Sequence, residues 1–117
     1  MRLGDIAREL QLSEITPPDA ESAEGDITRG YASDLLSDVL AHAPAGGVLV
    51  TLQVHLNVIA VASHAELAAV IFAGKRRPDD EVVAKAVAEG LSLYVSADDT
   101  FDVVGRLYAL GLKGTSA

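Results

Sequence analysis

The sequence predicts an α/β domain with a mostly parallel sheet flanked by helices. Short apolar segments of strand length alternate with segments in which apolar residues recur every three or four positions, the spacing of a helix. Residues 69–73 are entirely apolar, as expected of a strand that is covered on both faces. With 117 residues the chain has the length of one domain, and we expect a single domain over residues 1–117.

The first part of the chain supplies a helix and two strands. Residues 2–10 carry apolar side chains at helical spacing, and residues 12–16 suit a short strand. Residues 17–25 are polar and contain two adjacent prolines, so they are predicted to form a loop. Residues 27–32 favour a strand.

A second helix and the central strand follow. Ser33 and Asp34 can cap a helix that runs to about Ala43, where a Pro-Ala-Gly-Gly sequence ends it. Val48–Gln53 is predicted as a strand, and Asn57 can cap the next helix, over about residues 58–64. The expected buried face of the second helix consists of Leu35, Leu36, Val39 and Leu40.

The last part of the chain continues the alternation. Asp79, which follows a proline, opens a helix that ends at Gly90, and a short strand is predicted over Leu93–Val95. Residues 98–100 offer caps for a final helix that ends at Gly111. The side chains expected to face inward from these two helices are Val82, Val83, Ala86 and Val87, then Phe101, Val104, Leu107, Tyr108 and Leu110.

Polar and apolar side chains alternate strictly from Val50 to Val58. In an extended chain this spacing places Thr51, Gln53, His55 and Asn57 on one side. A solvent-facing side more often carries Lys, Glu or Arg, so four uncharged hydrogen-bonding groups indicate a contact surface. Because they lie between a strand end and a helix start, an anion such as a phosphate would suit them. The alternative is structural, with a helix cap, a backbone bond or a dimer contact satisfying each group.

Charge and hydropathy limit the partners. Nine basic and seventeen acidic residues give a net charge of −8, which argues against nucleic acid. The one basic cluster, Lys75-Arg76-Arg77, follows a buried strand and is either a phosphate contact or a solvated loop. Hydrophobic residues make up 50% of the chain and the mean hydropathy is +0.28, so we expect apolar surface to face a second copy, a partner enzyme or another domain.

Membrane insertion and export are not expected. The chain contains no cysteine, and its first residues lack the apolar region of a signal peptide. The longest apolar zone, Val48–Ala73, is interrupted by polar side chains, so it does not suit a membrane span. The sequence predicts a soluble, cytoplasmic protein.

Residues 26–39 resemble the signature of the DRTGG domain family, with Arg29-Gly30 standing where the family has paired glycines. Thr51–Ala62 is similar to the second block of that family. Gly74 followed by Pro78-Asp79, and the later run Thr100–Tyr108, fit as well, so the resemblance covers nearly the whole chain in order.

This resemblance implies a Rossmann-like, three-layer α/β fold with four or five strands, as in the amino-terminal domain of bacterial HPr kinase/phosphorylase. Relatives stand beside CBS domains in regulated pyrophosphatases, where the module is regulatory and dimerising. We therefore expect a stand-alone regulatory module that forms a homodimer and senses a nucleotide or another phosphorylated small molecule. Kinase activity is rejected, because no G-x-x-x-x-G-K-[ST] phosphate loop is present.

Together these arguments define a candidate ligand site. Ser33 and Asp34 can join it from the neighbouring turn, although helix capping explains them equally. Asp34, Asp38 and His42 share one helix face, but nothing supplies further ligands, so neither a metal nor a cofactor is predicted. The residues predicted to bind the ligand are Ser33, Asp34, Thr51, Gln53, His55, Asn57 and Gly74.

Two other functions compete with ligand sensing. A small hydrolase or transferase could use His55 with Asp34 or Asp98, although capping also explains Asp98 and Asp99. A purely structural dimerisation adaptor would need no ligand. The arrangement of the polar groups in space distinguishes these functions.

Overall fold

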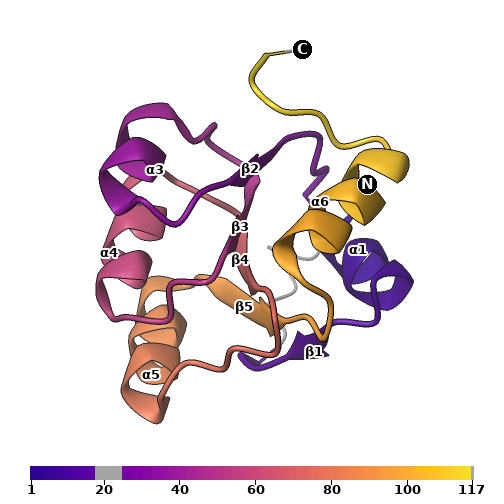
Figure 1. The fold of residues 1–117 in the computed structure, drawn as a ribbon. Coiled ribbons are helices and arrows are strands. Elements are labelled where there is room, and N and C mark those ends of the chain that lie inside the picture. The colour runs from indigo at the N-terminus through magenta and orange to yellow at the C-terminus, as the bar shows by residue number, and fades with distance from the viewer. Residues whose placement is uncertain (18–24, 117) are drawn as a thin grey trace.

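The computed structural model describes residues 1–17 and 25–116, which form an α/β domain with a five-stranded sheet between two layers of helices (Figure 1). The predicted loop over residues 17–25 lies largely outside the described residues. The strand order is β1-β5-β4-β3-β2. Four strands are parallel and β1 pairs antiparallel with β5, so the predicted α/β class with a mostly parallel sheet is confirmed.

The strands are short, as the sequence predicts. Their bounds are β1 Ser13–Glu14, β2 Gly30–Ala32, β3 Val48–Thr51, β4 Ala69–Phe72 and β5 Ser92–Val95. Every residue of β3 and β4 is buried, because helices cover both faces of the central sheet. The strand predicted over Val48–Gln53 is shorter in the structure and ends two residues earlier, at Thr51.

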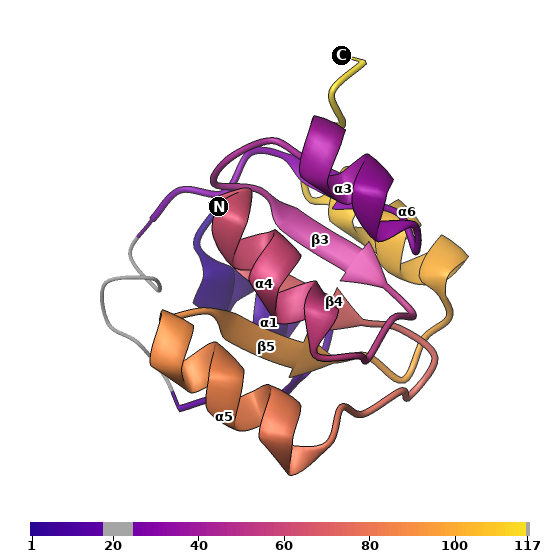
Figure 2. The ribbon, with the colours of Figure 1, turned by 90° about the vertical axis from the view of Figure 1, so that its left-hand side faces the viewer.

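Within the described residues, five helices form the outer layers. Their bounds are α1 Leu3–Glu9, α3 Leu36–His42, α4 Asn57–His64, α5 Asp80–Glu89 and α6 Thr100–Ala109. Helices α3, α4 and α5 lie side by side on one face of the sheet, where Figure 2 shows them towards the viewer, and α1 and α6 cover the other face. None of these described helices is long and apolar enough to cross a bilayer.

Two apolar cores separate the layers. On one face Phe72 and Leu49 are fully buried against Val39 of α3 and Ile59 of α4. On the other face the core contains Leu3 and Ile6 of α1, Val50 and Ile71 of the sheet, and Leu107 of α6. Side chains of successive strand residues thus enter opposite cores, and this is why the central strands tolerate few polar residues.

Two predicted helix ends are confirmed. Asp99 accepts a hydrogen bond from the backbone N–H of Asp102 at 2.9 Å, as an N-cap should. Gly90 follows α5 with φ of 70°, a left-handed conformation that glycine adopts without steric cost.

The predicted buried faces are wrong at six large side chains. These are Leu35, Leu40, Val87, Phe101, Val104 and Tyr108, all of which are exposed. Val39 of α3, Val82 of α5 and Leu107 of α6 are buried as predicted, and α6 also buries Val103, which was not predicted. The sequence places apolar residues on two adjacent stripes of these helices, and spacing alone does not tell which stripe faces the sheet.

Tyr94 of β5 generates a prediction about alkaline stability. It is 4% exposed, and burial, helped by the nearby charge of Glu14, raises its pKa to about 12. The folded state therefore favours the protonated phenol. This contribution is fully present below pH 10 and is lost as the pH rises from 10 towards 12, for a total of about 2–3 kcal/mol.

Urea unfolding between pH 9 and 12 measures this loss. Tyr94→Phe keeps the ring and removes the titrating group, so its stability should fall less steeply over the same range. Parallel pH profiles for the two proteins would contradict the assignment.

Candidate functional site

The candidate site lies where the parallel strands end. The turns that follow β2, β3, β4 and β5 meet along this edge, and each leads into a helix. The four strands stand side by side in chain order, so their order does not reverse as it does at the ligand crevice of a doubly wound sheet. Any ligand site at this edge must therefore be built by the turns themselves.

Asp34 and Thr51 are brought together at this edge. Thr51 is fully buried, and its hydroxyl donates to Asp34 Oδ1 at 3.0 Å. The same oxygen accepts from the backbone N–H of Leu52 at 2.7 Å. The Thr51 hydroxyl also accepts from the N–H of Gln53 at 3.1 Å. The Asp34 carboxylate thus joins the turn after β2 to the end of β3, rather than capping α3 as predicted.

The four alternating polar residues do not share one face of a strand. The strand ends at Thr51, and Gln53 and His55 lie in the turn that leads to α4. Gln53, His55 and Asn57 are exposed, whereas Thr51 is buried. The prediction of one extended polar face is therefore wrong, because β3 is covered on both sides and the chain turns as soon as it leaves the sheet.

The start of α4 does not offer free N–H groups to an anion. Asn57 is the first helical residue instead of the predicted cap, and its N–H donates to His55 Nδ1 at 3.2 Å. The N–H groups of Val58 and Ile59 donate to the carbonyls of His55 and Leu56. The first turn is thus satisfied by its own residues, and exposed side chains must provide any anion contact here.

The β4–α5 turn carries the basic cluster and is bonded to both of its neighbours. The N–H groups of Gly74 and Lys75 donate to the carbonyls of Asp98 at 2.7 Å and Ser96 at 2.8 Å. Arg76 Nε donates to the carbonyl of Leu52 at 2.6 Å. Gly74 and Lys75 both have left-handed backbones, with φ of 67° and 61°. Gly74 therefore shapes the turn through its backbone.

Asp38 and His42 do not converge with Asp34. The hydroxyl of Tyr31 donates to Asp38 Oδ2 at 2.8 Å. This bond is the main cause that holds the pKa of Asp38 below its usual range, while Ser33 and the charge of His42 act in the same direction. No group of three His, Asp or Glu side chains suited to a metal occurs in residues 1–17 and 25–116.

Ser33 stabilises its own turn. Its N–H donates to the carbonyl of Val50 at 3.2 Å, and its hydroxyl accepts from the N–H of Leu35 at 3.2 Å. The N-cap position of α3 belongs to Leu35, so the predicted cap at Ser33 is displaced by two residues. Ser33 remains partly accessible beside Asp34.

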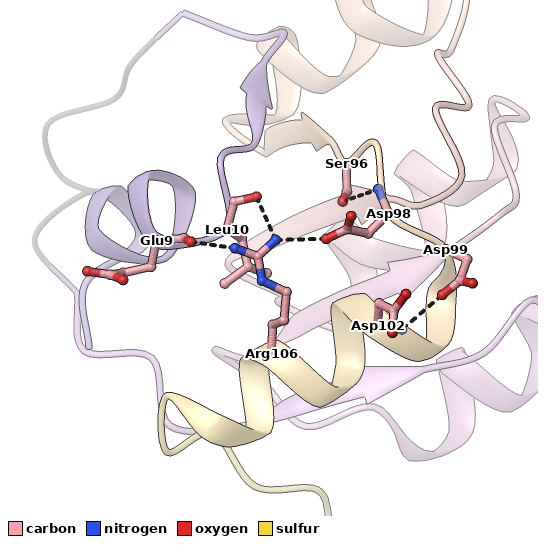
Figure 3. Close-up of polar contacts among 7 residues, drawn as sticks. All are labelled: Glu9, Leu10, Ser96, Asp98, Asp99, Asp102 and Arg106. Carbon is pink, nitrogen blue, oxygen red and sulfur yellow. Dashed lines mark hydrogen bonds and ion pairs between the residues drawn. The ribbon is translucent and has the colours of Figure 1, made fainter.

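Arg106 is a residue whose role the sequence did not reveal. From α6 its guanidinium donates to Asp98 Oδ2 at 2.7 Å and to the carbonyls of Glu9 at 2.8 Å and Leu10 at 3.4 Å (Figure 3). It thereby caps the carboxyl end of α1 and fixes the turn after β5. Its partners on α1, Glu9 and Leu10, lie 97 and 96 positions away, so no local pattern could have indicated them.

The carboxylates considered for catalysis have other partners. Asp34 binds Thr51 and Leu52, Asp98 pairs with Arg106, and Asp99 caps α6. His55 directs Nδ1 to the N–H of Asn57. Each of these side chains therefore takes part in a contact that holds the turns of this edge in place.

The contact between Asp34 and Thr51 predicts energetic coupling. Asp34→Ala leaves the buried Thr51 hydroxyl and the N–H of Leu52 without their acceptor, and should cost on the order of 1–3 kcal/mol. Thr51→Val removes the same hydroxyl. The double variant should then lose clearly less than the sum of the two single losses in urea unfolding. Strict additivity would show that the contact does not stabilise the edge.

Comparison with known proteins finds a similarity to a solved structure. No protein-family model and no curated protein sequence matches the chain. The crystal structure of the CBS and DRTGG domains of the regulatory region of Clostridium perfringens pyrophosphatase, complexed with its activator diadenosine tetraphosphate, is similar with a TM-score of 0.71 and 12% identity. The similarity covers 91% of this chain but 45% of that one, so this chain spans less than half of the regulatory region. The chain therefore shares its fold with part of that region, as its resemblance to the DRTGG family predicted.

Proposed function

We propose that this chain is a regulatory module that binds a nucleotide or another phosphorylated small molecule at the carboxyl edge of its sheet and catalyses no reaction itself. One observation carries the proposal. Three consecutive basic residues, Lys75, Arg76 and Arg77, are exposed at this edge, and Arg76 anchors their turn to the turn after β3 by its bond to Leu52. This anchor holds positive charge at Leu52, in the turn that also contains the exposed side chains of Gln53 and His55.

The charge distribution supports an anionic ligand. Three of the nine basic residues of a chain with net charge −8 stand next to each other in this one turn. Phosphate oxygens accept hydrogen bonds from guanidinium and ammonium groups, and charged partners strengthen these bonds. The amide of Gln53 and the imidazole of His55 add uncharged hydrogen-bonding groups of the kind that fix the orientation of a nucleotide.

The backbone of Lys75 supports a role for its side chain. A left-handed conformation costs a residue with a Cβ about 1–2 kcal/mol, and glycine avoids this cost. Lys75 nevertheless occupies such a position, directly after Gly74. Strain that is retained at an exposed lysine suggests that its ammonium group is needed there.

The regulatory assignment draws on the similar pyrophosphatase region. That structure holds diadenosine tetraphosphate, a polyphosphate ligand described as an activator. A shared fold supports the same class of ligand for this chain, and the basic turn provides a contact for its phosphates. Ligand binding would then regulate a partner enzyme or domain.

Ligand binding can be tested by thermal shift with diadenosine tetraphosphate, ATP, ADP and pyrophosphate. A ligand present at about a hundred times its Kd stabilises by about 2.7 kcal/mol, which corresponds to roughly ten degrees for a domain of this size. Lys75→Gly should raise the melting temperature of the free protein, because it relieves the backbone strain, yet it should reduce the shift that the ligand causes. His55→Ala should reduce the shift as well.

The control for charge is Arg8→Gln, on α1. Arg8 is exposed and pairs with Asp5. Its replacement removes one positive charge from α1, which covers the face of the sheet opposite to α4 and α5. The ligand shift should persist in this variant. A shift of equal size in Lys75→Gly and in the unmodified protein would refute the proposed site.

We also infer that the module forms a homodimer. Half of the residues are hydrophobic, and six large apolar side chains are exposed in the part of the chain that the structure describes. Burying part of this surface against a second copy removes apolar area from water.

Light scattering at micromolar concentration should give about twice the chain mass of 12.2 kDa. A specific dimer of this kind needs an interface of at least about 1,000 Å² in total. A monomeric mass at these concentrations would refute the dimer and leave the ligand proposal standing.

A further inference from the structure

Helix α6 turns a stripe of apolar side chains away from its own core. Phe101 is 85% exposed, Tyr108 is 56% exposed and Val104 is 37% exposed. Together with Gly105 they occupy positions i, i+3, i+4 and i+7, which form one face of a helix. The sheet-facing side of the same helix is provided by Val103 and Leu107, which are buried. We call residues 101, 104, 105 and 108 the α6 stripe.

The fold of the single chain does not explain the stripe. Gly105 lies inside a helix, where glycine lowers stability relative to alanine. A side chain at position 105 would have room, because a Cβ there would meet no atom within 4 Å. No neighbour in the chain therefore explains why this residue is glycine. A shallow hollow that is wide open to solvent lies over Gly105, bordered by Phe101, Val104 and Tyr108. Both the hollow and the glycine suit the close approach of another helix.

The order of residues in the stripe is symmetric. Phe101 and Tyr108 lie at its ends, and Val104 and Gly105 lie at its centre. A two-fold axis through the centre would place Phe101 of each copy on Tyr108 of the other, and Val104 of each copy on Gly105 of the other. In a two-fold interface a residue i contacts j and j contacts i, so such self-complementarity is what the symmetry requires.

Charges at the two ends of the stripe match the same arrangement. The amino end of α6 carries Asp99 and Asp102. At the carboxyl end, Lys113 places its ammonium group 3.8 Å from the centre of the Tyr108 ring. In an antiparallel pair of α6 helices the acidic end of each copy faces the basic end of the other, and the two helix dipoles oppose each other favourably.

We propose that the α6 stripe is the homodimer interface, with the α6 helices of two copies packed antiparallel across a two-fold axis at Val104 and Gly105. The proposal rests on the self-association part of the proposed function and is independent of the ligand site. Helix α6 and the α3–α5 layer lie on opposite faces of the sheet, so Leu40 of α3 and Val87 of α5, which are also exposed, are outside this interface (Figure 1).

Single cysteines test the geometry, because the chain has none of its own. A residue next to a two-fold axis lies beside its own copy, within the Cα separation of about 4.4–6.8 Å that a disulfide needs. Under mild oxidation Gly105→Cys should therefore form a disulfide-linked dimer in most molecules at micromolar concentration. The matched control is Val87→Cys, on α5, which is 49% exposed and should remain largely monomeric in the same denaturing gel.

Charge reversal provides a second, independent readout. Asp102→Lys and Lys113→Asp should each weaken the dimer by roughly three- to tenfold in Kd, measured by sedimentation, because each places like charges opposite one another. The combined variant should regain most of the original Kd. Restoration of this kind is not expected if either residue acts only within its own chain.

The outcomes separate the two proposals. A dimeric mass with cross-linking at Val87→Cys but not at Gly105→Cys would overturn the α6 interface and keep the dimer. A dimer that survives Phe101→Asp unchanged would also overturn the interface. A monomeric mass would overturn both. Because Phe101 is exposed, Phe101→Asp should leave the far-ultraviolet circular dichroism spectrum unchanged.

Discussion

The arrangement of this domain depends on the burial of its central strands from both sides. Every residue of β3 and β4 is enclosed by helices, so each strand has to supply apolar side chains to two cores at once. Polar groups are costly in such strands unless a hydrogen bond satisfies them. Thr51 is the one hydroxyl in these two strands, and Asp34 satisfies it at the point where the sheet ends. The polar side chains of this edge therefore lie in the turns that follow the strands.

These turns are held together by bonds that cross from one to the next. Asp34 joins the turn after β2 to β3, Arg76 joins the turn after β4 to the turn after β3, and the N–H groups of Gly74 and Lys75 join it to the turn after β5. The result is a continuous edge in which backbone and carboxylate groups are satisfied, while basic and amide side chains remain exposed.

The sequence was informative where the signal is local. Alternating apolar segments located the strands and helices, and Gly90 and Asp99 marked helix ends by their own chemistry. It was misleading at Thr51–Asn57, because alternation resembles a strand even after the chain has left the sheet. It did not reveal that the first N–H groups of α4 are already hydrogen-bonded, nor that Arg106 binds the end of α1. Both depend on contacts that only the folded chain creates.

The layer formed by α1 and α6 joins residues that are synthesised at very different times. Arg106 binds the carbonyl of Glu9 across 97 positions, and both helices cover the same core. A ribosome adding about 5–20 residues per second leaves α1 without this cover for roughly 5–20 seconds after it is made. The α3–α5 layer, whose partners follow one another directly, has no comparable delay. One half of the domain can therefore assemble while it is being translated, and the other half has to wait for α6.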